Sequence, residues 1–220
     1  MRNLSVLLVR VALVLFWVVL MPNAGFAAGN AAPTTQSPEM KSALFAGGSF
    51  WVLEQAFKNI PGIHNSVVGY SGGKTPRPNY VDVSHGGTGH RETLQVTYDP
   101  SKISYERLLA IYWRNIDPFD TDGQFCDTGE IYRTAIYVRG DEQKKAAEES
   151  KEKLEKRFGK KIATEILPAS IFYPAEEYHQ DYAEEHEFQY GLYHDTCGQE
   201  KGLKQIWGQE AGGNAYRKAQ

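Results

Sequence analysis

The chain has 220 residues, of which 41% are hydrophobic and 23% charged, and its formal net charge is −3 at neutral pH. These values are typical of a soluble globular domain, and two cysteines are too few for a disulfide-rich scaffold. The absence of a positive excess excludes the basic footprint of a nucleic-acid-binding protein. We therefore expect no nucleic-acid partner, and we expect a monomer.

Residues 1–27 have the layout of a secretory signal peptide. Arg2 lies in a short n-region, an apolar run covers residues 11–21, and small residues lead up to Ala27. An uncleaved membrane anchor is the alternative, but the run after Arg10 is about half of the ~20 residues that a spanning helix needs. We expect cleavage near Ala27 and export of the mature chain to the periplasm or the extracellular medium.

Residues 28–40 are rich in small, polar and proline residues, which predicts a linker. The folded domain is expected at residues 41–208, followed by a loose polar tail at residues 209–220. Periodicity and turn residues predict strands at 44–46, 65–70, 92–98, 134–138 and 162–167, helices at 50–58, 104–115, 141–158 and 174–187, and loops at 71–79 and 117–130.

The last of these helices is predicted to open at Pro174, because proline is tolerated at the first helical position. Strands and helices mix along the chain without strict alternation. This order favours an α+β fold, a two-layer α/β sandwich with a ferredoxin-like core, in which helices pack on a mixed sheet.

The segment Gly47-Gly48-Ser49-Phe50-Trp51 places a small polar side chain at a strand-to-helix junction. The first N–H groups of a helix point towards such a position and favour negative charge. Serine is also a common N-cap, so a purely structural role for Ser49 remains open. The hydrolase motif Gly-x-Ser-x-Gly is not satisfied, because Trp51 occupies its last position.

Metal-binding patterns are incomplete in this sequence. Cys126 and Cys197 fit no zinc spacing, although an oxidising compartment would permit a bond between them, and their pairing remains open. If Gly123 is the glycine of a calcium loop, the first and twelfth positions are not ligands. The other candidate ligands, His179, His186, His194, Glu176 and Glu177, are more simply explained as a helix surface. We therefore expect no metal site.

Several segments together resemble the A-type peptide methionine sulfoxide reductases. GGSFWVLE is similar to the Gly-Cys-Phe-Trp signature of that family. Further segments resemble family stretches in family order: GYSGGKTPRPNY, GHRE, YDPSKISYERLL, IYWRNIDP, DTGEIYRTAIY, TEILPASIFYPAEEYHQDY and LKQIWG. The resemblance covers about residues 44–208. It implies reduction of methionine-S-sulfoxide in oxidised proteins or peptides by an external thioredoxin-like dithiol, without a bound cofactor.

The resemblance also implies a site. It places Ser49 at the nucleophile position, Glu92 as proton donor, Phe50, Trp51, Tyr80, Asp127 and Tyr132 around the substrate, and Cys197 as resolving cysteine. This set suits a sulfoxide, whose apolar methyl needs an aromatic wall and whose oxygen needs hydrogen-bond donors. Glu92 can donate a proton only if its surroundings raise its pKa.

Ser49 departs from the family pattern, because the family has cysteine at this position. The family reaction oxidises a thiolate to a sulfenic acid and then to a disulfide, and serine oxygen has no equivalent of these states. Three interpretations follow: a pseudoenzyme that only binds methionine sulfoxide, a chain whose parent protein has cysteine at position 49, or a displaced nucleophile at Cys126. The last is the weakest, because the neighbouring Asp127 carboxylate would raise the thiol pKa.

Overall fold

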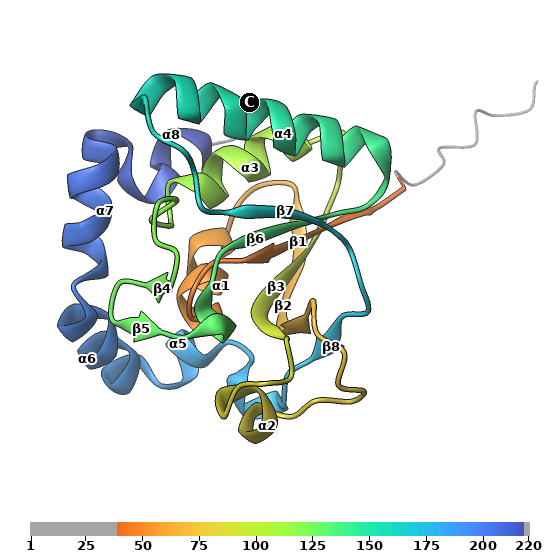
Figure 1. Ribbon diagram of the computed structural model, residues 1–220, viewed down its shortest axis with the longest axis vertical. Coiled ribbons are helices and arrows are strands. Elements are labelled where there is room, and N and C mark those ends of the chain that lie inside the picture. The colour runs from red at the N-terminus through yellow and green to blue at the C-terminus, as the bar shows by residue number, and fades with distance from the viewer. Residues whose placement is uncertain (1–38, 218–220) are drawn as a thin grey trace, which may run out of the picture. The chain divides into compact units, whose positions relative to one another are not determined.

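The computed structural model describes residues 39–217 (Figure 1). The predicted signal peptide, all but the last two residues of the predicted linker, and residues 218–220 lie outside this range. Among the described helices, none combines the length and the apolar composition needed to cross a membrane.

A six-stranded mixed sheet forms the centre of the domain. It contains β1 (Lys41–Ala46), β2 (Ile63–Ser71), β3 (Arg91–Tyr98), β6 (Ala135–Val138), β7 (Glu165–Pro168) and β8 (Tyr173–Pro174), in the order β7-β6-β1-β3-β2-β8. Only β6 and β7 run parallel, and the other neighbours are antiparallel. The predicted α+β architecture with a mixed sheet is confirmed.

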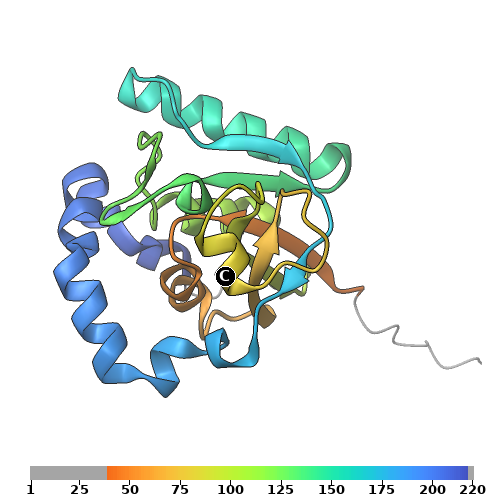
Figure 2. The same cartoon turned by 60° about the horizontal axis from the view of Figure 1, so that its bottom comes forward.

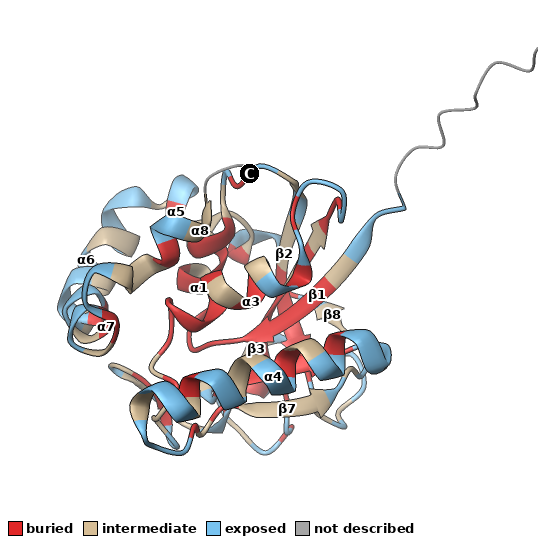
Figure 3. Ribbon diagram, turned by 90° about the horizontal axis from the view of Figure 1, so that it is seen from above, coloured by how far each residue is buried: buried red, intermediate tan, exposed pale blue. Residues whose placement is uncertain are grey.

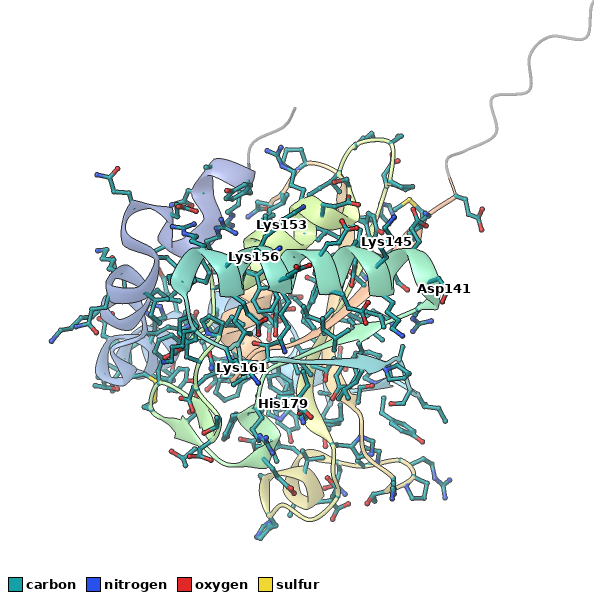
Figure 4. The ribbon with its side chains drawn as sticks, turned by 45° about the horizontal axis from the view of Figure 1, so that its top comes forward. Asp141, Lys145, Lys153, Lys156, Lys161 and His179 are labelled. Atoms are coloured by element: carbon teal, nitrogen blue, oxygen red, sulfur yellow. A yellow bond between two sulfur atoms is a disulfide. The ribbon has the colours of Figure 1, made fainter. Side chains whose placement is uncertain are left out.

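Helices α1 (Phe50–Phe57), α3 (Tyr105–Trp113) and α4 (Gly140–Phe158) contribute to the main core with the central strands. Side chains of β1 alternate between the two faces of the sheet, as strand geometry requires. Ala43 and Phe45 belong to the main core, whereas Leu44 and Ala46 join a smaller cluster. Figure 3 shows buried residues concentrated in β1, α1 and α3, and Figure 4 shows charged residues along α4, among them Lys145, Lys153 and Lys156.

The predicted helix at residues 174–187 is wrong. Pro174 lies in β8, which pairs with Gly69 and Tyr70 at the edge of the sheet, where a residue without an N–H is tolerated. The chain then continues through a 3-10 turn (Glu177–His179), α5 (Tyr182–Glu185), α6 (Glu187–Cys197) and α7 (Gln199–Trp207). Figure 2 shows this segment, in blue, running around one side of the domain.

The predicted loose tail is also wrong for the residues that the structure describes. Residues 208–217 form a 3-10 turn (Gly208–Gly213) and α8 (Asn214–Arg217). The Arg114 guanidinium lies 5.1 Å from the ring centre of Trp207 and 4.6 Å from that of Tyr216. Because Gly212 N–H also donates to the carbonyl of Arg114, the C-cap residue of α3, over 2.9 Å, residues 208–217 are held against the C-terminal end of that helix.

Candidate functional site

A cavity of about 200 Å³ lies at the N-terminal end of α1. Its walls are formed by Ser49, Trp51, Tyr80, Glu92, Asp127, Tyr132 and Tyr193. Six of these seven residues are predicted site residues, and Tyr193 is new. The cavity is smaller than the roughly 300–1,000 Å³ of sites for drug-sized ligands, so it suits a single side chain.

Ser49 is buried at the turn from β1 into α1. It is the N-cap residue of α1, but its side chain makes no capping hydrogen bond. Its side chain instead lines the cavity, as Tyr193 does. The turn depends on Gly48, whose φ is +83° and at which a Cβ would lie 2.7 Å from Cβ of Gln124. The serine hydroxyl therefore faces the cavity.

Glu92 lies on β3, next to the start of α1, and is 3% exposed. Its Oε2 accepts a hydrogen bond of 2.9 Å from the Phe50 N–H. Burial raises the pKa of Glu92 to about 8, against the lowering effect of that N–H and with a smaller contribution from the Asp127 charge. At neutral pH this carboxyl is mostly protonated, so it can donate a hydrogen bond to a ligand.

Two tyrosines face Glu92 from different segments. Tyr80 begins α2 (Tyr80–Ser84), where its N–H donates to Oε1 of Glu176 over 2.8 Å. Tyr132 ends a 3-10 turn (Glu130–Tyr132). Burial, followed by the nearby Glu92, raises the pKa of both phenols. Both phenols are therefore neutral hydrogen-bond donors at physiological pH.

Asp127 and Tyr193 close another side of the cavity. Asp127 lies in β5 (Asp127–Thr128), which pairs with β4 (Gly123–Gln124) in a hairpin within the predicted loop. Tyr193 lies on α6, and its hydroxyl donates to Oδ2 of Asp127 over 2.5 Å. Burial raises the pKa of Asp127, and the Tyr193 hydrogen bond opposes that rise. Sequence reasoning missed Tyr193, because nothing local in α6 points to a residue 66 positions earlier.

The two aromatic residues after Ser49 have different positions. Trp51 lines the cavity and stacks on Tyr182 of α5, with ring centres 3.9 Å apart. Phe50 is 1% exposed and is not part of the cavity wall; it packs on Tyr70 and His179. Its contribution to the site is therefore the backbone N–H bonded to Glu92, with its ring filling the core behind Trp51.

Within the described residues, one group has metal-ligand character, comprising Cys126, Asp127 and Cys197. Its two sulfurs are already joined in a disulfide. His179, one of the histidines considered in the sequence, is buried among aromatic rings, and burial lowers its pKa. The groups that the cavity offers to a ligand are instead the neutral donors Glu92, Tyr80 and Tyr132, beside the aromatic ring of Trp51.

The sequence model of the family described as "Peptide methionine sulfoxide reductase" matches residues 41–211, most of the chain and all of the cavity. The chain belongs to this family of oxidoreductases. Among its curated relatives, peptide methionine sulfoxide reductase MsrA of Bacillus licheniformis is 51% identical over 170 residues, covering 76% of this chain and 94% of the relative. MsrA 2 of Caulobacter vibrioides is 43% identical over 192 residues, covering 87% and 97%.

Solved structures of methionine sulfoxide reductases share the fold. Reduced Mxr1 of Saccharomyces cerevisiae gives a TM-score of 0.65 at 33% identity, covering 68% of this chain and 87% of Mxr1. Methionine sulfoxide reductase A of Corynebacterium diphtheriae gives 0.62 at 32% identity, covering 69% and 77%. The mixed sheet with its covering helices is thus the fold of the methionine sulfoxide reductase A family.

The two cysteines of this methionine sulfoxide reductase homologue are bonded to each other. Cys197 ends α6, and Cys126 is exposed in the β4–β5 turn. The pairing that the sequence left open is therefore present in the structure. No thiol is free in this state of the chain.

Proposed function

We propose that the cavity binds the side chain of methionine-S-sulfoxide in oxidised peptides or proteins. The observation that supports this most is the buried Glu92, with a pKa of about 8, beside Ser49. The protonated carboxyl and the phenols of Tyr80 and Tyr132 are donors for the sulfoxide oxygen. Trp51 offers an apolar surface for the methyl group.

We further propose that Ser49 impairs the family reaction in this chain. A thiolate at position 49 would attack the sulfoxide sulfur, release methionine and remain as a sulfenic acid; a second thiol would then form a disulfide for an external, thioredoxin-like dithiol to reduce. The Ser49 hydroxyl is a weak nucleophile without a partner base, and oxygen cannot follow this redox sequence. The chain would then be a methionine-sulfoxide-binding protein on a reductase fold.

A displaced nucleophile is a poorer explanation. Cys126 is bonded to Cys197 and must first be reduced. Its sulfur lies 3.8 Å from Oδ1 of Asp127, and a carboxylate at that distance disfavours the thiolate. This alternative predicts turnover in the Ser49 chain that depends on Cys126.

Titration with a short peptide is expected to show binding of the sulfoxide in the order S epimer, R epimer, unoxidised methionine, from tightest to weakest. The pocket is small, so a Kd of about 0.1–10 mM is expected for the S epimer. Amide chemical shifts or Trp51 fluorescence report the binding. Equal affinity for sulfoxide and methionine would refute the proposal.

Matched variants localise that binding. Tyr80→Phe keeps the ring and removes one donor, so it is expected to weaken S-sulfoxide binding by about tenfold. Lys153→Gln, on the exposed face of α4, serves as the control and should leave the Kd unchanged. An unchanged Kd in Tyr80→Phe would place the ligand elsewhere.

We also propose that the mature chain is exported, because residues 1–27 have the layout of a cleavable signal peptide. N-terminal sequencing of the protein recovered from the medium or periplasm is expected to start near Ala28. Recovery of the full-length chain in the membrane fraction would instead support the uncleaved anchor.

A further inference from the structure

The Cys126–Cys197 disulfide joins two segments that each supply one wall residue of the cavity. Cys126 lies in the tight turn between β4 and β5, directly before Asp127. Cys197 ends α6, four residues after Tyr193, so the two side chains lie on the same face of that helix. The covalent bond and the Tyr193–Asp127 hydrogen bond therefore join the same pair of segments, side by side (Figure 1).

Helix α6 obtains little of its position from a packed core. None of its residues is buried, and Figure 3 shows it as intermediate or exposed along its length. It is separated from α5 at His186, which has φ −129° and ψ 50°, and from α7 at Gly198, which has φ +68°. Without extensive burial, the placement of Tyr193 relies strongly on its few specific links.

We propose that the Cys126–Cys197 disulfide positions Asp127 and Tyr193 in the cavity, so that reducing it weakens the binding of methionine sulfoxide. This inference rests on the binding function proposed above. Tyr193 links the cavity residues together, because its hydroxyl donates to Asp127, its ring lies edge-on to Trp51 at 6.1 Å, and it lines the cavity with Ser49. Displacement of α6 removes this link and opens one wall of the cavity.

A dithiol, either dithiothreitol or a thioredoxin-like protein, can reduce the Cys126–Cys197 disulfide. One of its thiolates attacks a sulfur of the disulfide and forms a mixed disulfide while the other protein sulfur leaves as a thiolate. The second thiol of the reductant then closes its own disulfide and releases the remaining cysteine. Two electrons pass to the protein, which gains two thiols. Cys126 is exposed and Cys197 half-buried, so the reductant has access.

The size of the effect follows from the population of the ordered cavity. If one reduced molecule in ten keeps Tyr193 in place, the apparent Kd rises about tenfold. Oxidising conditions, which generate methionine sulfoxide, keep the disulfide closed and the cavity ready to bind. Reducing conditions release the ligand.

The test measures the Kd of an S-sulfoxide peptide with the oxidised chain, the dithiothreitol-reduced chain and the Cys126→Ser/Cys197→Ser variant, at a temperature where circular dichroism shows each to be folded. Reduction and the double substitution are expected to raise the Kd about tenfold. Reoxidation should restore the parent chain but not the variant. The Lys153→Gln control should keep the full redox response.

Two further results separate this positioning role from general stabilisation. Tyr193→Phe in the oxidised chain is expected to weaken binding, and its Kd should then respond much less to reduction; this measurement does not depend on the reduced chain remaining folded. An unchanged Kd in oxidised Tyr193→Phe, or equal Kd values for folded oxidised and reduced chains, overturns the inference and leaves the proposed function intact. Absence of sulfoxide binding in both states overturns both.

Discussion

Ser49→Cys is expected to give the chain methionine-S-sulfoxide reductase activity at least about a thousandfold above the parent. The new sulfur would occupy the N-cap of α1, where the first N–H groups of the helix lower a thiol pKa. The protonated Glu92 beside it can supply the proton that the sulfoxide oxygen needs. The measurement is reduction of a sulfoxide peptide with dithiothreitol, followed by chromatography of the methionine peptide.

Controls for this gain of activity are available at the same position. Ser49→Ala should remain as inactive as the parent, because neither side chain can form a sulfenic acid. Robust turnover by the Ser49 chain that disappears in Cys126→Ala would contradict the proposal and identify Cys126 as the nucleophile. A cysteine codon at position 49 in the source gene would make the parent protein an ordinary reductase.

The free energy of unfolding is expected to fall by several kcal/mol as the pH rises from 4.5 to 8. An exposed glutamate loses its proton near pH 4.5, whereas burial raises the pKa of Glu92 in the folded chain to about 8. Between these values the unfolded state releases a proton that the folded state retains, so stability is fully present below pH 4.5 and is lost towards pH 8. For Glu92 alone the loss is roughly 4 to 5 kcal/mol.

The Glu92→Gln variant tests this assignment. Glutamine keeps the shape and an oxygen for the Phe50 N–H, but it does not titrate, so this variant is expected to be more stable than the parent at pH 8 and similar to it at pH 4. Glu54, whose pKa burial raises to about 7, contributes in the same direction, and Glu54→Gln is the matched comparison. Urea unfolding at several pH values measures both. The same pH slope in Glu92→Gln as in the parent would contradict the assignment.

Local patterns in the sequence were enough to predict the central elements of the fold. The strand predicted at residues 92–98, in which Leu94, Val96 and Tyr98 alternate, is β3 in the structure. The helix predicted at residues 104–115, in which Leu108, Leu109 and Tyr112 have helical spacing, is α3. These elements bury one regular face, so their period is visible in the residues themselves. The motif resemblance, likewise local, named six of the seven cavity-lining residues.

The region after residue 172 was decided by tertiary contacts. Pro174 resembled a helix start, but it pairs with β2, which lies about a hundred residues earlier in the chain. Residues 208–217 were predicted to be a loose tail because their sequence is polar, and nothing in it indicates that Tyr216 packs against Arg114. In both places a distant partner outweighed the local preference, as is common for short or polar segments.

The sequence by itself therefore determined the fold class and the family. The tertiary structure decided that Phe50 is buried while Trp51 lines the cavity, that Tyr193 completes the wall, and that Cys126 pairs with Cys197. The physical reason is sequence separation. Tyr193 contacts Asp127, which lies 66 residues earlier in the chain, and the two cysteines are 71 residues apart. Contacts between residues so far apart in sequence produce no periodic pattern in either segment.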